Sequence, residues 1–129
     1  AVEVRVSGLD AELTIETQSF EQSLTNIVLN AADAMDGQGT VVIELMEDED
    51  AYIVEISDEG PGISIAHRAH VFEPFWSSKP HGSGTGLGLS MSKRLITDMG
   101  GRLLLREPQP GQGAVFAIYL PKILAQPAT

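Results

Sequence analysis

The chain has 129 residues, a formal net charge of −10 and no cysteine. This length supports one domain with its own hydrophobic core, and the lack of thiols excludes disulfides and thiolate metal sites. An acidic chain is a poor match for nucleic acid, whose phosphates demand clustered lysine and arginine. The sequence has no apolar run of membrane-spanning length. We therefore expect no direct membrane contact and a cytoplasmic location, with any membrane tether in segments outside this one.

The charge is divided unevenly between the two halves of the chain. Residues 1–60 hold 15 acidic residues and one basic residue, whereas residues 61–129 hold three acidic and seven basic residues. A solvated acidic face accounts for most of this asymmetry. The basic half also carries a glycine-rich segment, and that combination suits an anionic small ligand.

Four strands are expected in the first half of the chain. Alternation of apolar and charged residues predicts short strands at 2–6 and 13–15. Residues 40–46 and 52–56 are rich in β-forming residues and flank an acidic turn, which predicts an antiparallel hairpin.

Two longer helices are expected as well. Ser19 and Gln22 have the spacing of a capping box, which predicts a helix from there to Met35. A second helix is predicted from Leu87 to Met99, because apolar residues recur at positions 87, 91, 95 and 99.

The remaining segments complete a mixed architecture. Ser64 is expected to cap a short helix over 65–71, and a last hairpin is expected from 102–106 and 114–120, followed by a frayed tail. The sum is an α/β two-layer sandwich, with one mostly antiparallel sheet and helices on one face.

The segment Gly82-Ser-Gly-Thr-Gly-Leu-Gly-Leu89 has a glycine at every second position and leads into the second predicted helix. Such a loop can bind an anion, because free backbone N–H groups and the helix dipole both favour phosphate. A flexible connector explains the glycines equally well, since neither the P-loop pattern nor the dinucleotide-binding pattern is present.

Two other groups of residues could carry chemistry. Asn26 and Asn30 lie four residues apart on the first helix, and an amide oxygen is a ligand that Mg²⁺ accepts beside phosphates and water. A polar helix edge is the alternative. Asp58, followed by Gly60 and Gly62, could accept a hydrogen bond from an exocyclic amine such as that of adenine, or it could simply form a turn.

Lys79 lies just before the glycine-rich segment, where it could add positive charge to a terminal phosphate or remain solvated. The aromatic residues before it, Phe72, Phe75 and Trp76, are expected to form the packed hinge of a lid. The histidines are expected at the surface, without a metal role; they are His67, His70 and His81.

Taken in order, these motifs resemble the ATP-binding catalytic domain of sensor histidine kinases, within the superfamily that includes gyrase and MutL. The resemblance spans nearly the whole chain, with an N box at 24–35, a G1 box at 58–62, an F box at 72–75, a G2 box at 82–89 and a final glycine motif at 111–116. It implies the Bergerat α/β sandwich. It also implies that residues 1–129 are one catalytic domain of a longer sensor kinase, with an ATP lid at about 73–86.

The resemblance also implies a role for each matching residue. Asn30 would coordinate Mg²⁺ and act with Lys79 in catalysis, and Asp58 would bind the adenine amine of ATP. The other nucleotide contacts would come from the pocket, the lid and the loop amides, namely Asn26, Asp33, Gly60, Gly62, Ile63, Phe75, Gly82, Ser83, Gly84, Thr85, Gly86, Leu87 and Gly88.

Two positions depart from patterns of the superfamily. Asp33 stands where many such kinases carry lysine or arginine, so a basic contact to phosphate is missing there. Asn26 stands where gyrase and MutL carry a glutamate that acts as general base for water. An amide cannot take up a proton, which favours transfer to a histidine over hydrolysis. Met35 and the segment 76–79 resemble the nitrogen- and oxygen-regulation branch of these kinases.

The expected reaction is phosphoryl transfer from Mg·ATP to a histidine in two-component signalling, with a response regulator as partner of the full-length kinase. The acceptor is expected on a separate dimerisation domain, because His67 is followed by Arg68 and His81 by Gly82 instead of by an acidic residue. This fragment is therefore expected to be monomeric and not to label itself. The alternatives are an ATPase or protein-serine kinase of the same superfamily, or a non-catalytic nucleotide-sensing module.

Overall fold

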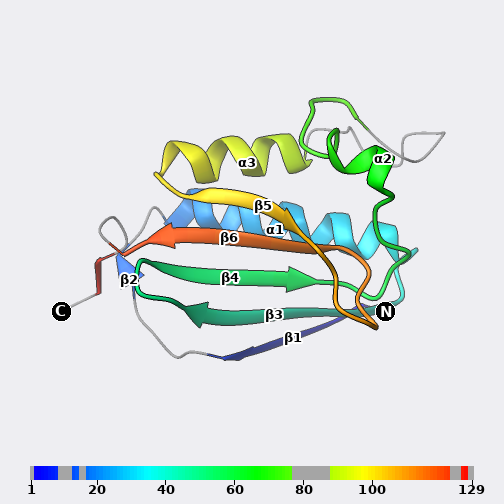
Figure 1. Ribbon diagram of the computed structural model, residues 1–129, viewed down its shortest axis with the longest axis horizontal. Helices are drawn as coiled ribbons and strands as arrows, with labels where there is room; N and C mark the ends of the chain where they lie inside the picture. The colour runs from blue at the N-terminus through cyan, green and yellow to red at the C-terminus, as the bar shows by residue number, and fades with distance from the viewer. Residues whose placement is uncertain (1, 9–12, 15–16, 77–87, 123–125, 128–129) are drawn as a thin grey trace.

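The computed structural model describes residues 2–8, 13–14, 17–76, 88–122 and 126–127 of the chain. Strands and helices alternate irregularly along it, as Figure 1 shows. In chain order the elements are β1 (Val2–Gly8), β2 (Leu13–Thr14), α1 (Thr17–Ala34), β3 (Gly39–Glu47), β4 (Ala51–Ser57), α2 (Ile65–Arg68), α3 (Gly88–Asp98), β5 (Arg102–Arg106), β6 (Val115–Pro121) and β7 (Gln126–Pro127).

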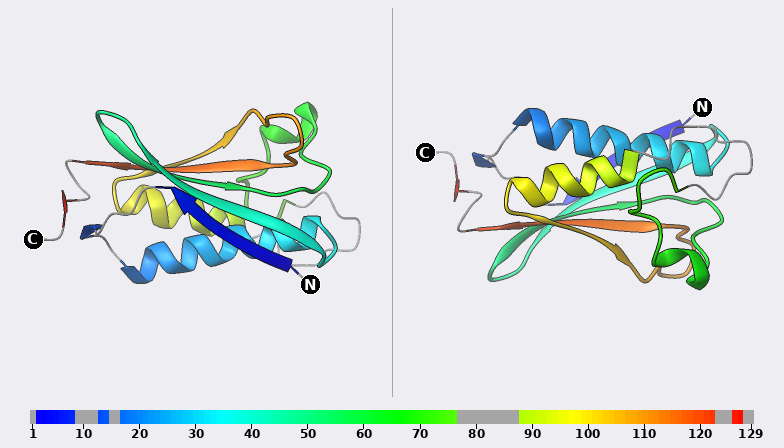
Figure 2. Two further views of the ribbon diagram at one scale, coloured as in Figure 1. Left: turned by 90° about the horizontal axis from the view of Figure 1, so that it is seen from below. Right: turned by 90° about the horizontal axis from the view of Figure 1, so that it is seen from above.

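The described strands form a five-stranded sheet in the order β1-β3-β4-β6-β5 and a separate pair of β2 with β7. β1 runs parallel to β3, and the other neighbours in the large sheet are antiparallel. The two longer helices, α1 and α3, cover one face of this sheet (Figure 2). The predicted two-layer sandwich with a mostly antiparallel sheet is therefore confirmed, and so are both predicted hairpins.

The core lies between the helices and the sheet. Alternate residues of each central strand point to the helices, among them Val41, Ile56 and Ile118, which are at most 1% exposed. Ile27 of α1 and Ile96 of α3 meet them from the other layer and are fully buried. Burial of each such side chain stabilises the fold by roughly 1.5–3 kcal/mol, so the sandwich depends mainly on these apolar contacts.

The two helices approach each other closely at a pair of fully buried serines. The hydroxyl of Ser92 donates to the backbone oxygen of Ser23 at 3.1 Å, and the Ser23 hydroxyl donates to the backbone oxygen of Ser19 at 2.8 Å. Small side chains at this crossing let the helix backbones come together. α1 begins at Thr17, so the prediction of Ser19 as the helix cap is wrong.

The apolar series that predicted α3 does not mark its buried face. Met91 is 49% exposed, whereas Leu89 and Ile96 are buried together with a serine. Hydrophobic periodicity identified the helix, but the packing of α3 against α1 chose a different face.

Two smaller predictions are also corrected. α2 ends at Arg68 instead of continuing to 71, and the side chain of Ser64 makes no capping hydrogen bond. The expected frayed tail contains β7, which pairs with β2. Among the described residues, no helix is both long enough and apolar enough to cross a membrane.

Candidate functional site

The carboxylate of Asp58 is held in place by backbone amides. Asp58 follows β4 directly and is 4% exposed. Its Oδ1 accepts hydrogen bonds from the N–H groups of Gly60 at 2.8 Å and Ala114 at 3.1 Å. Within the described part of the chain both bonds go to Oδ1, so Oδ2 is the atom that can accept a donor from a ligand.

The backbone around Asp58 is fixed from a second direction. The N–H of Gly113 donates to the Asp58 carbonyl at 2.7 Å, and the Asp58 N–H donates to the Ala114 carbonyl at 3.1 Å. These bonds continue the antiparallel register of β4 and β6, in which Ser57 pairs with Val115. The carboxylate therefore extends from the end of the sheet with little freedom.

Glycines are required where three segments meet at this point. A Cβ added to Gly60 would lie 3.1 Å from Asp58 Oδ1 and 3.4 Å from the carbonyl oxygen of Ala34, which ends α1. Gly62 has a φ of +79° and faces the carbonyl of Gly113. Without side chains, the segment after β4 lies directly between α1 and the connection from β5 to β6.

A row of residues along α1 links this end of the sheet to the start of α3. Asn26, Asn30 and Ala34 are four residues apart on one helix face, and both asparagines are half-buried. Gly88, the first residue of α3, lies beside Asn26, since an added Cβ there would be 3.9 Å from the Asn26 Cβ. At 1.5 Å per residue the row is about 12 Å long, and it connects the Asp58 end to the Gly88 end.

The Asn26 amide is oriented by its own helix. Gln22 donates a hydrogen bond from Nε2 to Asn26 Oδ1 at 3.0 Å. This bond fixes the rotation of the amide, whose NH₂ group can donate to a ligand. The capping-box pattern predicted only a helix-capping role for Gln22, although its spacing of four residues from Asn26 is also that of neighbours on one helix face.

The donor set along α1 fits a cation that shares its coordination with phosphate. In the described ranges, no group of three or more His, Cys, Asp or Glu side chains could hold a metal ion. The neutral amide oxygen of Asn30 is a ligand that Mg²⁺ accepts, provided that phosphate oxygens and water complete the octahedron.

The aromatic residues in the F box and directly after it differ in how far they are buried. Phe72 packs edge-to-face on Phe116, with ring centroids 6.0 Å apart, and the ammonium group of Lys93 lies 4.4 Å from the Phe72 ring centroid. Trp76 is half-buried against the core. Phe75 is 76% exposed with a φ of +64°, so the prediction that it packs into a hinge is wrong.

The other predicted residues lie as follows. Ile63 packs against the core, and Asp33 is exposed on α1. The expectation of surface histidines is confirmed for His67 and His70, which are both exposed. The remaining predicted residues fall outside the described part of the chain; they are Lys79, His81, Gly82, Ser83, Gly84, Thr85, Gly86 and Leu87.

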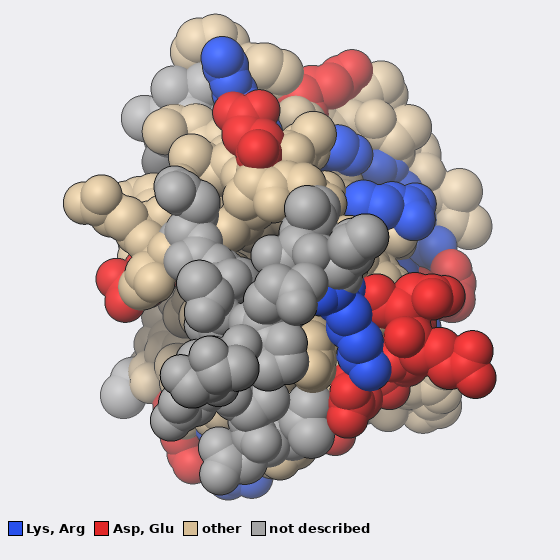
Figure 3. Space-filling view, turned by 90° about the vertical axis from the view of Figure 1, so that its left-hand side faces the viewer, with Lys and Arg blue, Asp and Glu red and all other residues tan. Residues whose placement is uncertain are grey.

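The acidic turn between β3 and β4 lies at the opposite end of β4 from Asp58. Figure 3 shows that end of the molecule, where acidic side chains gather on one side. Residues 47–50 are exposed there, and Lys122 forms an ion pair with Glu47 at 2.7 Å. Four of the fifteen acidic residues of the first half therefore lie at the far end of β4 from Asp58.

Comparison with known proteins places this geometry in a family. Residues 15–124 match the model described as Histidine kinase-, DNA gyrase B-, and HSP90-like ATPase. The chain belongs to this family. The resemblance stated from the motifs alone is thereby confirmed, and the family includes the catalytic domains of histidine kinases.

Similar proteins include several sensor kinases. The chain is 35% identical over 120 residues to the signal transduction histidine-protein kinase AtoS of Escherichia coli K12, which covers 90% of this chain and 19% of that protein. It is 38% identical over 106 residues to the sensor histidine kinase ZraS of Salmonella typhi, which covers 81% of this chain and 22% of that protein. The chain thus spans about a fifth of the length of these relatives.

Solved structures give the same assignment. The mycobacterial sensor histidine kinase MprB superposes with a TM-score of 0.80 at 28% identity, covering 98% of this chain and 84% of that chain. Full-length ShkA, solved in complex with AMPPNP, superposes with a TM-score of 0.76 at 26% identity and covers 100% of this chain and 27% of that chain.

Proposed function

We propose that this domain binds Mg·ATP and supplies the γ-phosphoryl group to a histidine on a separate dimerisation domain, in two-component signal transduction. The observation that carries the proposal is the buried Asp58 carboxylate, whose Oδ1 is engaged by two backbone amides while Oδ2 is left for a ligand. The exocyclic amine of adenine is a donor that suits this atom.

The α1 row supports a direction for the rest of the nucleotide. With adenine at Asp58, the phosphates extend along Asn30 and Asn26 toward the start of α3 at Gly88. Free N–H groups at a helix N-terminus favour phosphate. Asn30 would hold the magnesium ion, which, when bound, neutralises phosphate charge in the transfer reaction.

Two observations support transfer to a histidine in preference to hydrolysis of ATP. Asn26 carries an amide that cannot act as general base, and its oxygen already accepts a hydrogen bond from Gln22. The relatives that cover most of this chain are named as sensor histidine kinases. The response regulator and the dimerisation domain belong to the proposal for the whole protein.

The test is calorimetric titration of ATP, with and without Mg²⁺, against the chain and its Asp58→Asn variant. Asparagine keeps an Oδ1 acceptor for Gly60 and Ala114 but replaces the free oxygen with an NH₂ group, which opposes the adenine amine. A lost hydrogen bond to a charged group predicts an ATP affinity about 10-fold to 100-fold weaker. Glu44→Gln, on the exposed outer face of β3, is the control and should bind as the parent does.

A second assay tests the transfer. Incubation with ATP labelled in the γ-phosphate and a supplied acceptor domain should label that domain and not this chain. A folded parent chain that does not bind ATP, or an Asp58→Asn variant that binds it equally well, would refute the adenine site. Steady hydrolysis without an acceptor would favour the ATPase, and binding without transfer would favour a nucleotide-sensing module.

A further inference from the structure

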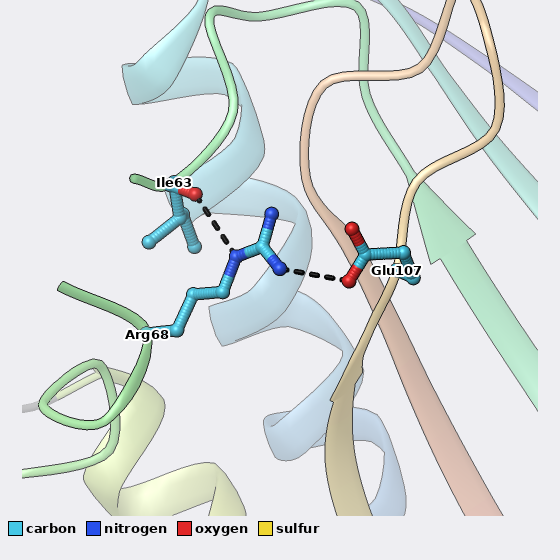
Figure 4. A network of polar contacts seen from close by, with 3 residues as sticks. All are labelled: Ile63, Arg68 and Glu107. Carbon is cyan, nitrogen blue, oxygen red and sulfur yellow. Dashed lines mark hydrogen bonds and ion pairs between the residues drawn. The ribbon is translucent and has the colours of Figure 1, made fainter. Parts of the chain in front are cut away.

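Arg68 connects two segments that are far apart in the sequence, as Figure 4 shows. Its Nε donates to the backbone oxygen of Ile63 at 3.2 Å, and its Nη1 lies 2.8 Å from Oε2 of Glu107. Ile63 follows the G1 glycines, and Glu107 comes directly after β5. One guanidinium group therefore bridges the segment after Asp58 and the connection from β5 to β6.

These are the same two segments that meet at the Asp58 carboxylate. There they are joined by the amides of Gly113 and Ala114, which donate to the Asp58 carbonyl and to Oδ1 respectively. At the Arg68 end both segments line a cavity of about 140 Å³, with Gly62 and Ile63 from one and Pro108, Gln112, Gly113 and Ala114 from the other. Since a cavity lies between them here, the Arg68 bridge is a contact that spans it.

The two contacts of Arg68 use two different nitrogens of its guanidinium group, which suits an arginine at this position. The planar guanidinium group presents several N–H donors in fixed directions, so it can serve a backbone carbonyl and a carboxylate together. The Arg68 side chain is 32% exposed and the Glu107 side chain is 79% exposed. The ion pair is therefore largely screened by solvent, and the partly buried bond to the Ile63 carbonyl is the less screened of the two contacts.

Apart from an edge-to-face contact of His67 with Trp76, with ring centroids 5.3 Å apart, α2 contributes little else that would hold this region. It is one turn of helix with no buried residue, and the side chain of Ser64 does not cap it. Arg68 is the last residue of α2. Within the described ranges, its side chain links this turn to Ile63 in the segment after Asp58 and to Glu107 in the β5–β6 connection.

We propose that Arg68 is a positioning residue for the adenine end of the site. By bridging Ile63 and Glu107, it holds the G1 segment and the β5–β6 connection at the separation that keeps the Gly113 and Ala114 amides on Asp58. The inference rests on the proposed function, because it assumes that Asp58 recognises the amine of adenine. Arg68 thereby controls the preference for adenine over a purine that lacks this amine.

The experiment compares Arg68→Ala and Arg68→Lys with Glu107→Gln and the control Arg94→Ala. Arg94 forms an exposed ion pair with Asp98 at 3.9 Å on the outer side of α3, away from both segments. Hydrogen exchange of the Gly113 and Ala114 amides is measured on the nucleotide-free chain, together with thermal unfolding. Dissociation constants for ATP and for inosine triphosphate, in which an oxygen replaces the amine, are then measured by calorimetry.

We expect Arg68→Ala to remain folded, to exchange both amides several-fold faster and to lower the preference for ATP over inosine triphosphate about 5-fold, the effect of one ordinary hydrogen bond. Arg68→Lys should behave like Arg68→Ala, because the two bonds come from different nitrogens of the guanidinium group and the single nitrogen of lysine cannot occupy both positions. Glu107→Gln should show a smaller change, since the bond to Ile63 remains. Arg94→Ala should match the parent chain.

Four results would overturn the inference. Unchanged exchange and an unchanged ATP preference in Arg68→Ala would show that the bridge does not position the site. A lower melting temperature with the preference intact would make Arg68 a structural residue only, and full rescue by lysine would show that charge suffices. A parent chain without preference for ATP would refute the adenine site itself, and this inference with it.

Discussion

Replacing Gly113 with alanine tests whether the close approach of the β5–β6 connection fixes the Asp58 carboxylate. An added Cβ would lie 2.7 Å from the backbone nitrogen of Gly60, and it would also collide with the Gly60 carbonyl and Asp58 Oδ1. Two of these neighbours are backbone atoms, so the segments must separate. Overpacking of this kind costs about 1–3 kcal/mol of unfolding free energy, and we expect ATP affinity to fall about 10-fold or more as the bonds to Oδ1 lengthen.

Gly111 provides a matched control two residues away. Its φ is +88° and an added Cβ would meet nothing within 4 Å. Gly111→Ala therefore costs backbone strain of about 1–2 kcal/mol without displacing Asp58. Urea unfolding should show similar destabilisation for both variants, whereas calorimetry should show weaker ATP binding for Gly113→Ala alone. If Gly113→Ala binds ATP as tightly as Gly111→Ala does, the Asp58 carboxylate is not fixed by this contact.

Four further substitutions test packing and charge elsewhere in the chain. Ile96→Ala should lower the unfolding free energy by about 2–5 kcal/mol, while Met91→Ser should change it by at most about 0.5 kcal/mol; the reverse order in urea unfolding would contradict the buried face of α3. Ser92→Leu should cost about 1–3 kcal/mol by overpacking, and a neutral result would mean that the crossing at Ser23 is not close-packed. The amides of Asp50 and Ala51 hold the pKa of the Asp48 carboxyl below its ordinary value of 3.8. Its contribution is therefore present above that value and is lost as the pH falls through the lowered pKa, so Asp48→Ala should be destabilising at about pH 7 and less so at about pH 3.

The parts of the fold that depend on local pattern could be predicted from the sequence. The hairpin of β3 and β4 follows from alternation on either side of an acidic turn, and both long helices follow from their periodicity. The parallel pairing of β1 with β3 could not be predicted, because the choice of partner depends on how α1 crosses the sheet. The buried serines were also missed, since hydrophobic periodicity assigns a polar residue to the exposed face.

The candidate site was predictable in its residue types and not in its bonds. Asp58, Asn30 and the glycines were predicted as site residues from their order and spacing, and their roles stay predictions. The hydrogen bond from the Ala114 amide to Asp58 Oδ1 depends on the register of β4 against β6, which brings together two residues that are 56 positions apart in the sequence. Arg68 carried no sequence signal, because its partner Glu107 is 39 positions away and its other partner is a backbone carbonyl.

The contact between α1 and α3 at the two serines also determines how close the asparagines of α1 lie to the start of α3. Ser92 packs on the Ser23 carbonyl, and one turn earlier on α3 Gly88 lies beside Asn26, which is three residues after Ser23 on α1. The close approach at the two serines therefore sets the distance between the asparagine row and the start of α3. A larger side chain at Ser92 must move Gly88 away from Asn26 while leaving the backbone bonds around Asp58 in place. Stability and the proposed phosphate end of the site thus depend on the same helix contact, whereas the proposed adenine end depends on the sheet and on the connection from β5 to β6.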